Sequence, residues 1–193
     1  MKIGVLALQG DFQEHCQVLK RIGVECREIR LPEDLSDIDG LIIPGGESTT
    51  VGKLATTFGL LEPLQNLSKS IPLWGTCAGL VFMARDVGHD QPILGIMDVV
   101  VQRNAFGRQV DSFEEDLDIK GIPDGPFHGV FIRAPIIQDV GPDVEVMCRV
   151  RDKRIVAARQ GRLLVTAFHP ELTEDDRLHR YFLSMAANTA TKA

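Results

Sequence analysis

Short apolar runs alternate with amphipathic stretches through the first half of the chain. The first run is apolar almost throughout, as expected for a strand covered on both faces. The strands predicted from these runs are Lys2–Gln9, Val24–Arg30, Gly40–Ile43 and Ile71–Trp74. The helices predicted between them are Asp11–Ile22, about Thr49–Phe58, and Leu61–Leu67. Strands that alternate with helices through short links predict a parallel sheet wrapped by helices.

The second half is richer in predicted strands and ends in one helix. The strands are Asp98–Gln102, Phe113–Ile119, Pro126–Ile132, Val144–Val150, Ile155–Arg159 and Leu163–Phe168. The link Arg151–Arg154 is too short for a crossover, so some of these strands should be antiparallel. Arg177–Ala187 is predicted as a helix and Asn188–Ala193 as a frayed tail. We expect one α/β domain over residues 1–193, three-layered, with a mostly parallel central sheet.

A cysteine stands at the end of one of the buried strands. Ile71–Trp74 leads into Gly75-Thr76-Cys77-Ala78-Gly79, and an apolar run follows. A strand, a sharp turn and a helix with a cysteine at the apex form the thiol counterpart of the Gly-x-Ser-x-Gly elbow. The glycines leave room where neighbouring elements pass close, and a helix N-terminus favours the thiolate. The turn therefore predicts that Cys77 is a nucleophile.

A histidine and a glutamate follow a second buried strand. Leu163–Phe168 is succeeded by His169-Pro170-Glu171, and the proline favours an extended conformation for the residue before it. Residues two apart in an extended segment point to the same side, so Glu171 can hold one imidazole nitrogen while the other faces Cys77. Cys77, His169 and Glu171 are then nucleophile, base and orienting acid. Cys77 and His169 both fall at carboxyl ends of predicted strands, where open α/β sheets bind ligands.

Paired glycines follow the third predicted strand, in the segment Pro44-Gly45-Gly46-Glu47-Ser48. Backbone N–H groups in such a segment are free to point at an anion. The N–H groups of Gly46 and Ala78 would form an oxyanion hole, which contributes roughly 3–4 kcal/mol per donor in proteases. In a chain without Cys77, a tight turn capped by Ser48 would explain this segment equally well.

Each motif also has a simpler explanation. A lone cysteine is more often a buried apolar filler than a nucleophile, and a lone histidine is usually structural. His-Pro-Glu alone is explained as a strand exit. The presence of both motifs at the ends of apolar strands in one chain favours catalysis.

Composition and charge narrow the functional class. A net charge of −6 with 25% charged residues offers no basic stripe for nucleic acid. No stretch reaches the roughly 20 apolar residues of a membrane span, and the N-terminus does not resemble a signal peptide. The four cysteines, Cys16, Cys26, Cys77 and Cys148, have no C-x-x-C spacing and suggest neither a zinc site nor a redox pair. Free thiols without an export signal predict a cytoplasmic protein.

Taken together, these residues resemble the class I (triad) glutamine amidotransferases. The resemblance spans almost the whole chain, and the cysteine elbow and His-Pro-Glu mark the class. Further motifs are similar to one branch of that class, the glutaminase subunits of pyridoxal 5′-phosphate synthase. These motifs are Leu8-Gln9-Gly10-Asp11 with Glu14-His15, Pro44-Gly45-Gly46-Glu47-Ser48-Thr49-Thr50, the loop Arg103–Phe113, and Phe131-Ile132-Arg133-Ala134-Pro135.

The resemblance implies that Cys77 attacks the carboxamide of L-glutamine while His169, oriented by Glu171, accepts and later returns the proton. Ammonia leaves, and water hydrolyses the glutamyl thioester. The ammonia would pass to a separate (β/α)₈ synthase subunit, in a hetero-oligomer that makes pyridoxal 5′-phosphate. The chain itself would hold no cofactor and no metal. The residues implied to hold glutamine are Gly46, Glu47, Ser48, Arg103, Ile132 and Arg133.

Two other functions compete with this one. Intracellular-protease-like proteins also place a cysteine at a strand–helix elbow, but they do not need His169-Pro170-Glu171 or the Arg103 loop. A regulatory subunit that binds glutamine or a partner without turnover is the alternative outside enzymes. Reactivity of Cys77 toward a glutamine-mimicking electrophile distinguishes these functions. We also expect the isolated chain to be weakly active, because the Gly45-Gly46 donor lies on a loop that docking can order.

Overall fold

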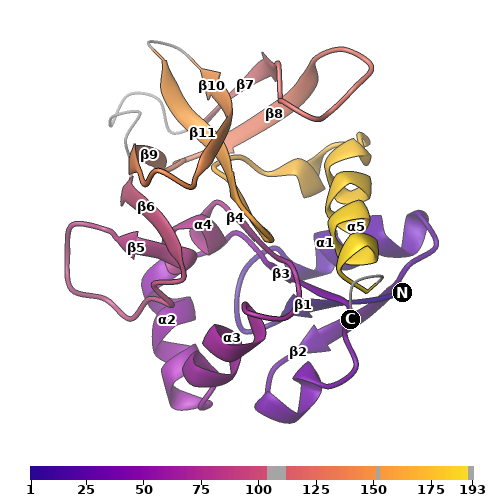
Figure 1. The fold of residues 1–193 in the computed structure, drawn as a ribbon, viewed down its shortest axis with the longest axis vertical. Helices are drawn as coiled ribbons and strands as arrows, with labels where there is room; N and C mark the ends of the chain where they lie inside the picture. Colours follow the sequence, from indigo (N-terminus) through magenta and orange to yellow (C-terminus); the bar gives the residue numbers. More distant parts are fainter. Residues whose placement is uncertain (104–111, 151–152, 191–193) are drawn as a thin grey trace.

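The computed structural model describes residues 1–103, 112–150 and 153–190, with helices on either side of a large sheet (Figure 1). The strands are β1 (Lys2–Leu6), β2 (Glu25–Ile29), β3 (Gly40–Ile43), β4 (Leu73–Thr76), β5 (Ala84–Asp86), β6 (Met97–Gln102), β7 (Ser112–Leu117), β8 (Phe127–Ile132), β9 (Ile136–Val140), β10 (Glu145–Val150), β11 (Arg154–Gln160) and β12 (Leu163–Thr166). The helices are α1 (Phe12–Arg21), α2 (Ser48–Thr57), α3 (Leu61–Leu67), α4 (Ala78–Met83) and α5 (Arg177–Ala190), with 3₁₀ turns η1 (Pro32–Leu35) and η2 (Pro170–Leu172).

The main sheet follows the order β2-β1-β3-β4-β12-β11-β9-β6-β5, and β10 pairs with β11. Its first half is parallel: β1 pairs with β2 and β3, and β4 lies between β3 and β12. The pairs β12–β11, β11–β9 and β9–β6 are antiparallel, and the edge strand β5 is parallel to β6. The prediction of a mostly parallel central sheet with antiparallel strands in the second half is confirmed. Because β4 and β12 are adjacent and parallel, the segments that follow them leave the sheet side by side.

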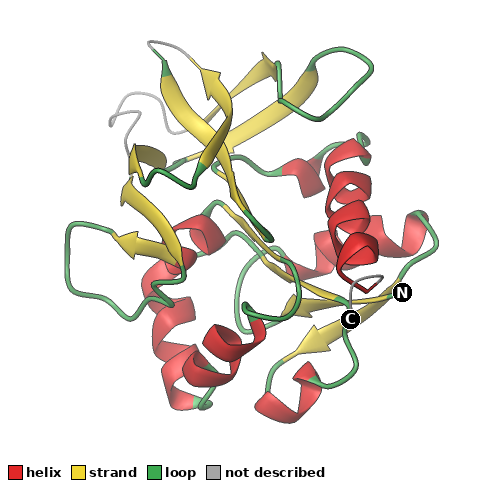
Figure 2. Ribbon diagram, in the orientation of Figure 1, coloured by secondary structure: helices red, strands yellow, loops and turns green. Residues whose placement is uncertain are grey.

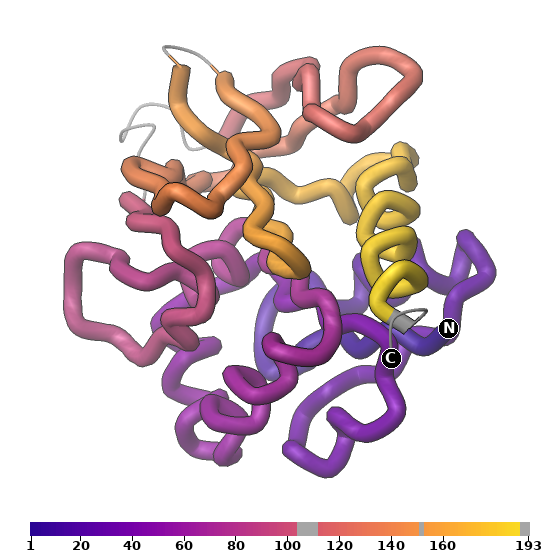
Figure 3. Tube along the Cα trace, in the orientation of Figure 1, coloured from indigo at the N-terminus to yellow at the C-terminus, as the bar shows by residue number. Residues whose placement is uncertain are grey.

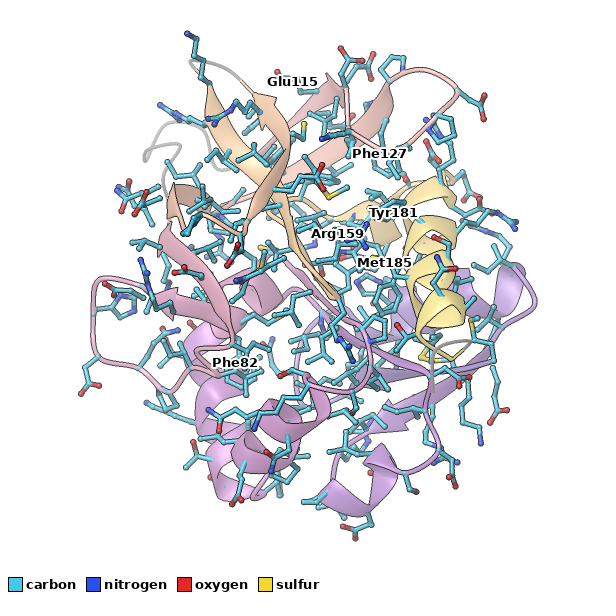
Figure 4. The ribbon with its side chains drawn as sticks, viewed as in Figure 1. Phe82, Glu115, Phe127, Arg159, Tyr181 and Met185 are labelled. Atoms are coloured by element: carbon cyan, nitrogen blue, oxygen red, sulfur yellow. A yellow bond between two sulfur atoms is a disulfide. The ribbon has the colours of Figure 1, made fainter. Side chains whose placement is uncertain are left out.

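Helices cover both faces of the parallel strands. In Figure 1, α1 and α5 lie on one side, and α2, α3 and α4 lie on the other. Trp74 of β4 is fully buried and packs against Phe182 of α5, with ring centroids 5.6 Å apart. Figure 4 shows Arg159 of β11 beside Tyr181 of α5, and the guanidinium donates a 2.8 Å hydrogen bond to the Tyr181 hydroxyl. These contacts hold α5 against strands β4 and β11 of the sheet.

A separate two-stranded antiparallel sheet, β7–β8, lies with β10 at the end of the molecule opposite α2 and α3 (Figures 2 and 3). Phe113 and Phe131 stack across this pair, with ring centroids 4.4 Å apart. Phe131 also contacts Phe168 just after β12, at 5.5 Å. The hairpin is thereby held against the main sheet at the level of His169.

Several predicted boundaries differ from the structure. The first strand ends at Leu6 rather than Gln9, which leaves Gln9 in the loop that approaches the glycine pair. Strands β5 and β9 were not predicted; they are only three and five residues long, and each contains two polar or charged residues that interrupt its apolar run. Asn188–Ala190 belongs to α5, so the prediction of a frayed tail is wrong for these residues. The Thr189 hydroxyl donates a hydrogen bond to the Met185 carbonyl within the helix. Residues 104–111 of the Arg103–Phe113 loop, residues 151–152 of the expected hairpin link and residues 191–193 of the tail lie outside the described part.

The expectation of four free thiols is wrong for one pair. Cys16 of α1 and Cys26 of β2 form a disulfide, with Cα atoms 5.5 Å apart. A search for C-x-x-C spacing misses this pair because the two positions meet only when α1 packs on β2. Cys77 and Cys148 remain free and buried.

Candidate functional site

The cysteine elbow has the geometry that its sequence predicts. Cys77 has φ 46° and ψ −101°, an unfavourable backbone conformation for a residue with a side chain. A Cβ on Gly79 would lie 2.0 Å from the Ile43 carbonyl oxygen, and one on Gly75 would lie 2.6 Å from Gly79. The Cys77 N–H donates to the Thr166 carbonyl at 2.8 Å, which ties the elbow to β12. Cys77 is thus held in a strained turn directly after β4 and before α4.

The thiol lines a pocket of about 360 Å³ at the carboxyl ends of the parallel strands. Every predicted site residue except Glu171 contributes to its wall. The Cys77 Sγ lies 4.0 Å from the Ile132 carbonyl oxygen. The lining residues are Gln9, Asp11, Gly46, Glu47, Ser48, Cys77, Ala78, Val81, Arg103, Ile132, Arg133, Pro135 and His169.

His169 is buried at the pocket wall and is oriented from behind. Its N–H donates to the Val130 carbonyl at 2.8 Å, and its Nδ1 lies 2.7 Å from Glu171 Oε1. Pro170 begins η2, which turns Glu171 under the ring, with its side chain fully enclosed. The His169 Nε2 has no hydrogen-bond partner among the residues that the structure describes. That nitrogen is therefore available to a group in the pocket.

Opposing effects set the ionisation of this pair. Burial lowers the pKa of His169, but the neighbouring Asp11, Cys77 and Glu171 side chains outweigh it and raise the pKa above its ordinary value. Burial raises the pKa of Glu171, and the neighbouring His169 acts against that rise. The arrangement favours an imidazolium with the Glu171 carboxyl group behind it, on the side away from the pocket.

The glycine loop is held in place by two side chains. Gly46 has φ +151°, and a Cβ there would lie 2.5 Å from Gln9 Oε1. The same Gln9 oxygen accepts a 2.7 Å hydrogen bond from the Glu47 N–H. Glu47, and not Ser48, caps α2, because its carboxylate accepts from the N–H groups of Thr49 and Thr50 at 3.2 and 2.8 Å.

The charge of Glu47 is well stabilised. Burial raises its pKa, but the hydrogen bonds from Thr50 and Thr49 outweigh this and lower it to about 2. Arg103 Nη2 adds an ion pair at 3.1 Å to Glu47 Oε1. The Glu47 carboxylate is thus a cap and a partner of Arg103.

Two arginines face the pocket from different elements. Arg103 follows β6, and its Nη1 lies within 3.2 Å of Thr49 Oγ1, Gln91 Oε1 and His89 Nε2. Arg133 follows β8 with φ 43°, a second strained residue at the rim. Cationic side chains at this position suit a ligand that carries a carboxylate.

Asp11, His169 and Glu171 present possible metal-ligand atoms within 4.8 Å of one another, the kind of group that a metal site needs. His169 Nδ1, however, already bonds the Glu171 carboxylate. The Asp11 Oδ2 lies 3.4 Å from the same nitrogen. A hydrogen-bonded cluster around the imidazole explains these three side chains.

Motif reasoning assigned no role to Gln9 or Asp11, which the structure brings to the pocket. Both lie between β1 and α1, and the carboxyl end of β1 lies at the same edge of the sheet as those of β4 and β12. The rule that located Cys77 and His169 therefore applies to them as well. Both residues belong to the motif Leu8-Gln9-Gly10-Asp11, which marked the resemblance but gave neither of them a role; their position in the sheet is the signal that could have done so.

Comparison with known proteins decides the family. The chain matches the SNO glutamine amidotransferase family over residues 5–188. It belongs to this family. A curated relative, pyridoxal 5′-phosphate synthase subunit PdxT of Moorella thermoacetica, is 59% identical over 187 residues, which cover 96% of this chain and 99% of the relative.

Solved structures agree with the family membership. A crystal structure described as a glutamine amidotransferase superposes with a TM-score of 0.91 at 52% identity and covers 96% of this chain and 98% of its own. A putative GMP synthase protein from Thermoplasma acidophilum has the same fold, with a TM-score of 0.73 at 17% identity over 99% of this chain and 96% of its own. The family fold is thus present over nearly the whole chain.

Among the residues that the structure describes, no helix is both long and apolar enough to cross a membrane.

Proposed function

We propose that this chain hydrolyses L-glutamine to L-glutamate and ammonia and delivers the ammonia to a separate pyridoxal 5′-phosphate synthase subunit. The observation that carries the proposal is the free, strained Cys77 in one pocket with His169, whose other face is bonded to Glu171 at 2.7 Å. The partner is inferred from the relatives, which are named as subunits of pyridoxal 5′-phosphate synthase.

In the proposed reaction, the Cys77 thiolate attacks the carboxamide carbon, and the carbonyl electrons move onto the oxygen. The N–H groups of Gly46 and Ala78 receive this oxyanion. His169 gives its proton to the amide nitrogen, the C–N bond breaks and ammonia leaves. Water then attacks the thioester while His169 takes its proton, glutamate departs and Cys77 is restored.

The rest of the pocket holds the substrate in this proposal. Arg103 and Arg133 provide cationic partners for the glutamine α-carboxylate. The remaining contacts come from the loop and the β8 end, namely Gly46, Glu47, Ser48 and Ile132. The chain needs no cofactor or metal for these steps, because the thiol, the imidazole and the backbone N–H groups supply nucleophile, proton and charge stabilisation.

The partner and the compartment are also proposals. A (β/α)₈ synthase subunit would form a hetero-oligomer with this chain and order the Gly45–Gly46 loop, so that the isolated chain has weak activity. The cytoplasm is the expected compartment, where glutamine and such a synthase would meet. The Cys16–Cys26 disulfide is not explained by this compartment, because cytosolic proteins rarely hold disulfides.

The first test measures glutamate release from glutamine by the purified chain, with and without the synthase subunit. Cys77→Ala serves as the blank, and Cys148→Ala is the matched control. Cys148 is buried, and burial, with the charges of Asp118 and Glu115, raises its pKa to about 11, which makes it a poor nucleophile. Release that requires the partner and is lost only in Cys77→Ala supports the proposal. A folded complex that releases no glutamate contradicts it and favours a binding subunit.

A glutamine-mimicking electrophile further distinguishes a glutaminase from a binding subunit. It should alkylate Cys77 and leave Cys148 unmodified in the folded chain, as measured by mass spectrometry of the two peptides. Equal modification of both thiols would contradict a recognition pocket at Cys77.

A further inference from the structure

Two histidines that the proposed reaction does not use lie buried directly behind the triad. His15 of α1 and His179 of α5 are both fully enclosed. Imidazoles are costly to bury without partners, and an apolar residue would fill either position without that cost. Their placement therefore calls for a role.

The contacts of His15 lead from the triad into the core. Its Nε2 lies 3.3 Å from Glu171 Oε2 and 3.2 Å from Thr76 Oγ1. Its Nδ1 lies 3.0 Å from His179 Nε2. The other Glu171 oxygen, Oε1, bonds His169 at 2.7 Å. His15 thus stands opposite His169 across a single carboxylate.

The second carboxylate oxygen of Glu171 still needs a donor. Oε2 is buried and makes no hydrogen bond of standard geometry among the described residues. A carboxylate oxygen only accepts, so it needs an N–H or O–H donor. His15 Nε2 is already at 3.3 Å, and hydrogen bonds at catalytic sites often tighten only when the substrate is bound.

We propose that His15 is a positioning residue of the triad, whose Nε2–H donates to Glu171 Oε2 and keeps the carboxylate ionised and aimed at His169. This inference rests on the proposed catalytic use of Glu171. The proton arrangement is self-consistent: His179 Nε2–H donates to His15 Nδ1, His15 Nε2–H donates to Glu171, and Glu171 Oε1 accepts from His169 Nδ1–H.

The surroundings favour a neutral His15 in this role. Burial, followed by the nearby His179 and His169, holds the pKa of His15 well below its usual range. Burial, and to a lesser extent Arg21, lowers the pKa of His179 to about 3, against a smaller opposing effect of Asp176. Asp11 is the other charged group that faces Glu171. A neutral donor stabilises the carboxylate without competing with the His169 imidazolium for it.

Trp74 holds the ring in place. Its indole makes edge contacts with His15 and His179, with ring centroids 5.8 and 5.0 Å apart. Its Nε1 donates to Thr166 Oγ1 at 3.2 Å, which fixes the indole itself. His15 therefore has little freedom to turn away from Glu171.

The test compares His15→Gln with His15→Asn. The glutamine amide nitrogen can occupy the place of Nε2 and reach Glu171, whereas the shorter asparagine reaches only toward His179. The readout is the rate of Cys77 alkylation by iodoacetamide as a function of pH, together with kcat and KM for glutamate release by the complex. Both variants are also made in a Glu171→Gln background.

We expect His15→Asn to lower the alkylation rate at neutral pH and kcat by about tenfold, the range for a lost hydrogen bond to a charged group, with KM unchanged. His15→Gln should stay within about threefold of the wild type. The gap between the two variants should vanish in the Glu171→Gln background, because the effect passes through that carboxylate. Equal rates for the two variants, or a gap that persists once the Glu171 carboxylate has been removed, would overturn the proposal.

A measurement on the unmodified chain covers the case in which a variant does not fold. Nitrogen-15 NMR of the histidine rings should show His15 as the neutral Nε2–H tautomer, and the Nδ1–H tautomer would refute the assignment. The proposed function is tested separately. If the wild-type complex releases no glutamate but the gap in alkylation between the two His15 variants holds, the glutaminase assignment fails and the His15 inference stands.

Discussion

The backbone of Gly45 lies directly against the imidazole of His169. A Cβ on Gly45 would lie 2.5 Å from His169 Cε1 and 3.0 Å from Nδ1, and 2.9 Å from Asp11 Oδ2. The loop proposed to receive the oxyanion is therefore packed so closely against the proposed base that no side chain fits between them. This packing explains why two glycines, rather than one, follow β3.

We expect Gly45→Ala to impair turnover more than stability. The ring can avoid the methyl group only by rotating away from Glu171 Oε1, which costs the 2.7 Å hydrogen bond that orients it. Glutamate release by the complex should fall about tenfold or more, the scale of one lost charge-assisted hydrogen bond. Gly59→Ala is the control, since no atom lies within 4 Å of the added Cβ, although its φ of +67° costs some stability. Unchanged kcat in Gly45→Ala would contradict the coupling of loop and base.

Gly79→Ala should act on the fold instead. The added methyl group would meet the Ile43 carbonyl oxygen at 2.0 Å, and backbone cannot rotate away as a side chain can. Overpacking of this kind costs roughly 3 kcal/mol. For a chain of this size that lowers Tm by about 6–12 °C, measured by calorimetry. Gly23→Ala is the control without a clash, because the new Cβ meets nothing within 4 Å, although its φ of +80° costs some stability; a larger loss in Gly79→Ala therefore measures the clash. A Tm indistinguishable from that of the wild type would show that the elbow can relax.

Sequence patterns pointed to the proposed triad because each motif carries its own local signal. Glycine is needed beside Cys77 because Ile43 approaches closely there. Pro170 begins the turn that places Glu171 under His169. Adjacency of β4 and β12 then brings the two motifs together. That adjacency follows from the order of strands in the sheet, which the sequence did not predict. The sequence predicted only that both motifs stand at carboxyl ends of strands, where a shared site is expected.

Two of the features that the sequence analysis missed depend on contacts between separate elements. Cys16 and Cys26 pair only because α1 packs on β2. His15 of α1 reaches Glu171, which lies near the other end of the chain. Glu47 caps α2 in place of Ser48, because its longer side chain folds back onto two N–H groups at once. The two contacts between elements have no local pattern from which they could be predicted, whereas the Glu47 cap is local and was missed because only Ser48 was considered as the cap.

Arg103→Ala should weaken glutamine binding without altering the thiol. The guanidinium is held at the pocket by Glu47 at 3.1 Å and by Gln91 at 3.1 Å, which prepares it for a carboxylate ligand. We expect KM for glutamine to rise about tenfold, the scale of one lost charge-assisted hydrogen bond, while alkylation of Cys77 by iodoacetamide, which has no carboxylate, stays unchanged. Arg180→Ala, an exposed arginine paired with Asp176, is the matched control. A fall in kcat with constant KM would assign Arg103 to the chemical step and contradict this prediction.

The buried histidines also predict how stability depends on pH. His179 has a folded-state pKa of about 3 because of burial, against about 6.5 in the unfolded chain. Between these values the unfolded state binds a proton that the folded state does not, so the free energy of unfolding falls as the pH falls, by about 1.4 kcal/mol per unit. His15 contributes with the same sign. Glu171 contributes with the opposite sign, since burial raises its pKa.

Urea unfolding at several pH values between about 6.5 and 4.5 measures this slope, and His179→Gln should reduce it by about 1.4 kcal/mol per pH unit. The comparison uses slopes, so a uniform loss of stability in the variant does not affect it. His128→Gln is the control. His128 is exposed on β8, and hydrogen bonds to Asp116 and Glu114 raise its pKa, so its stabilising effect is present at low pH and lost as the pH rises. Replacing His128 therefore cannot reduce the fall in the free energy of unfolding at acid pH. If His179→Gln keeps the wild-type slope, His179 is protonated or solvated in the folded chain, and the neutral His179–His15 pair behind Glu171 is excluded with it.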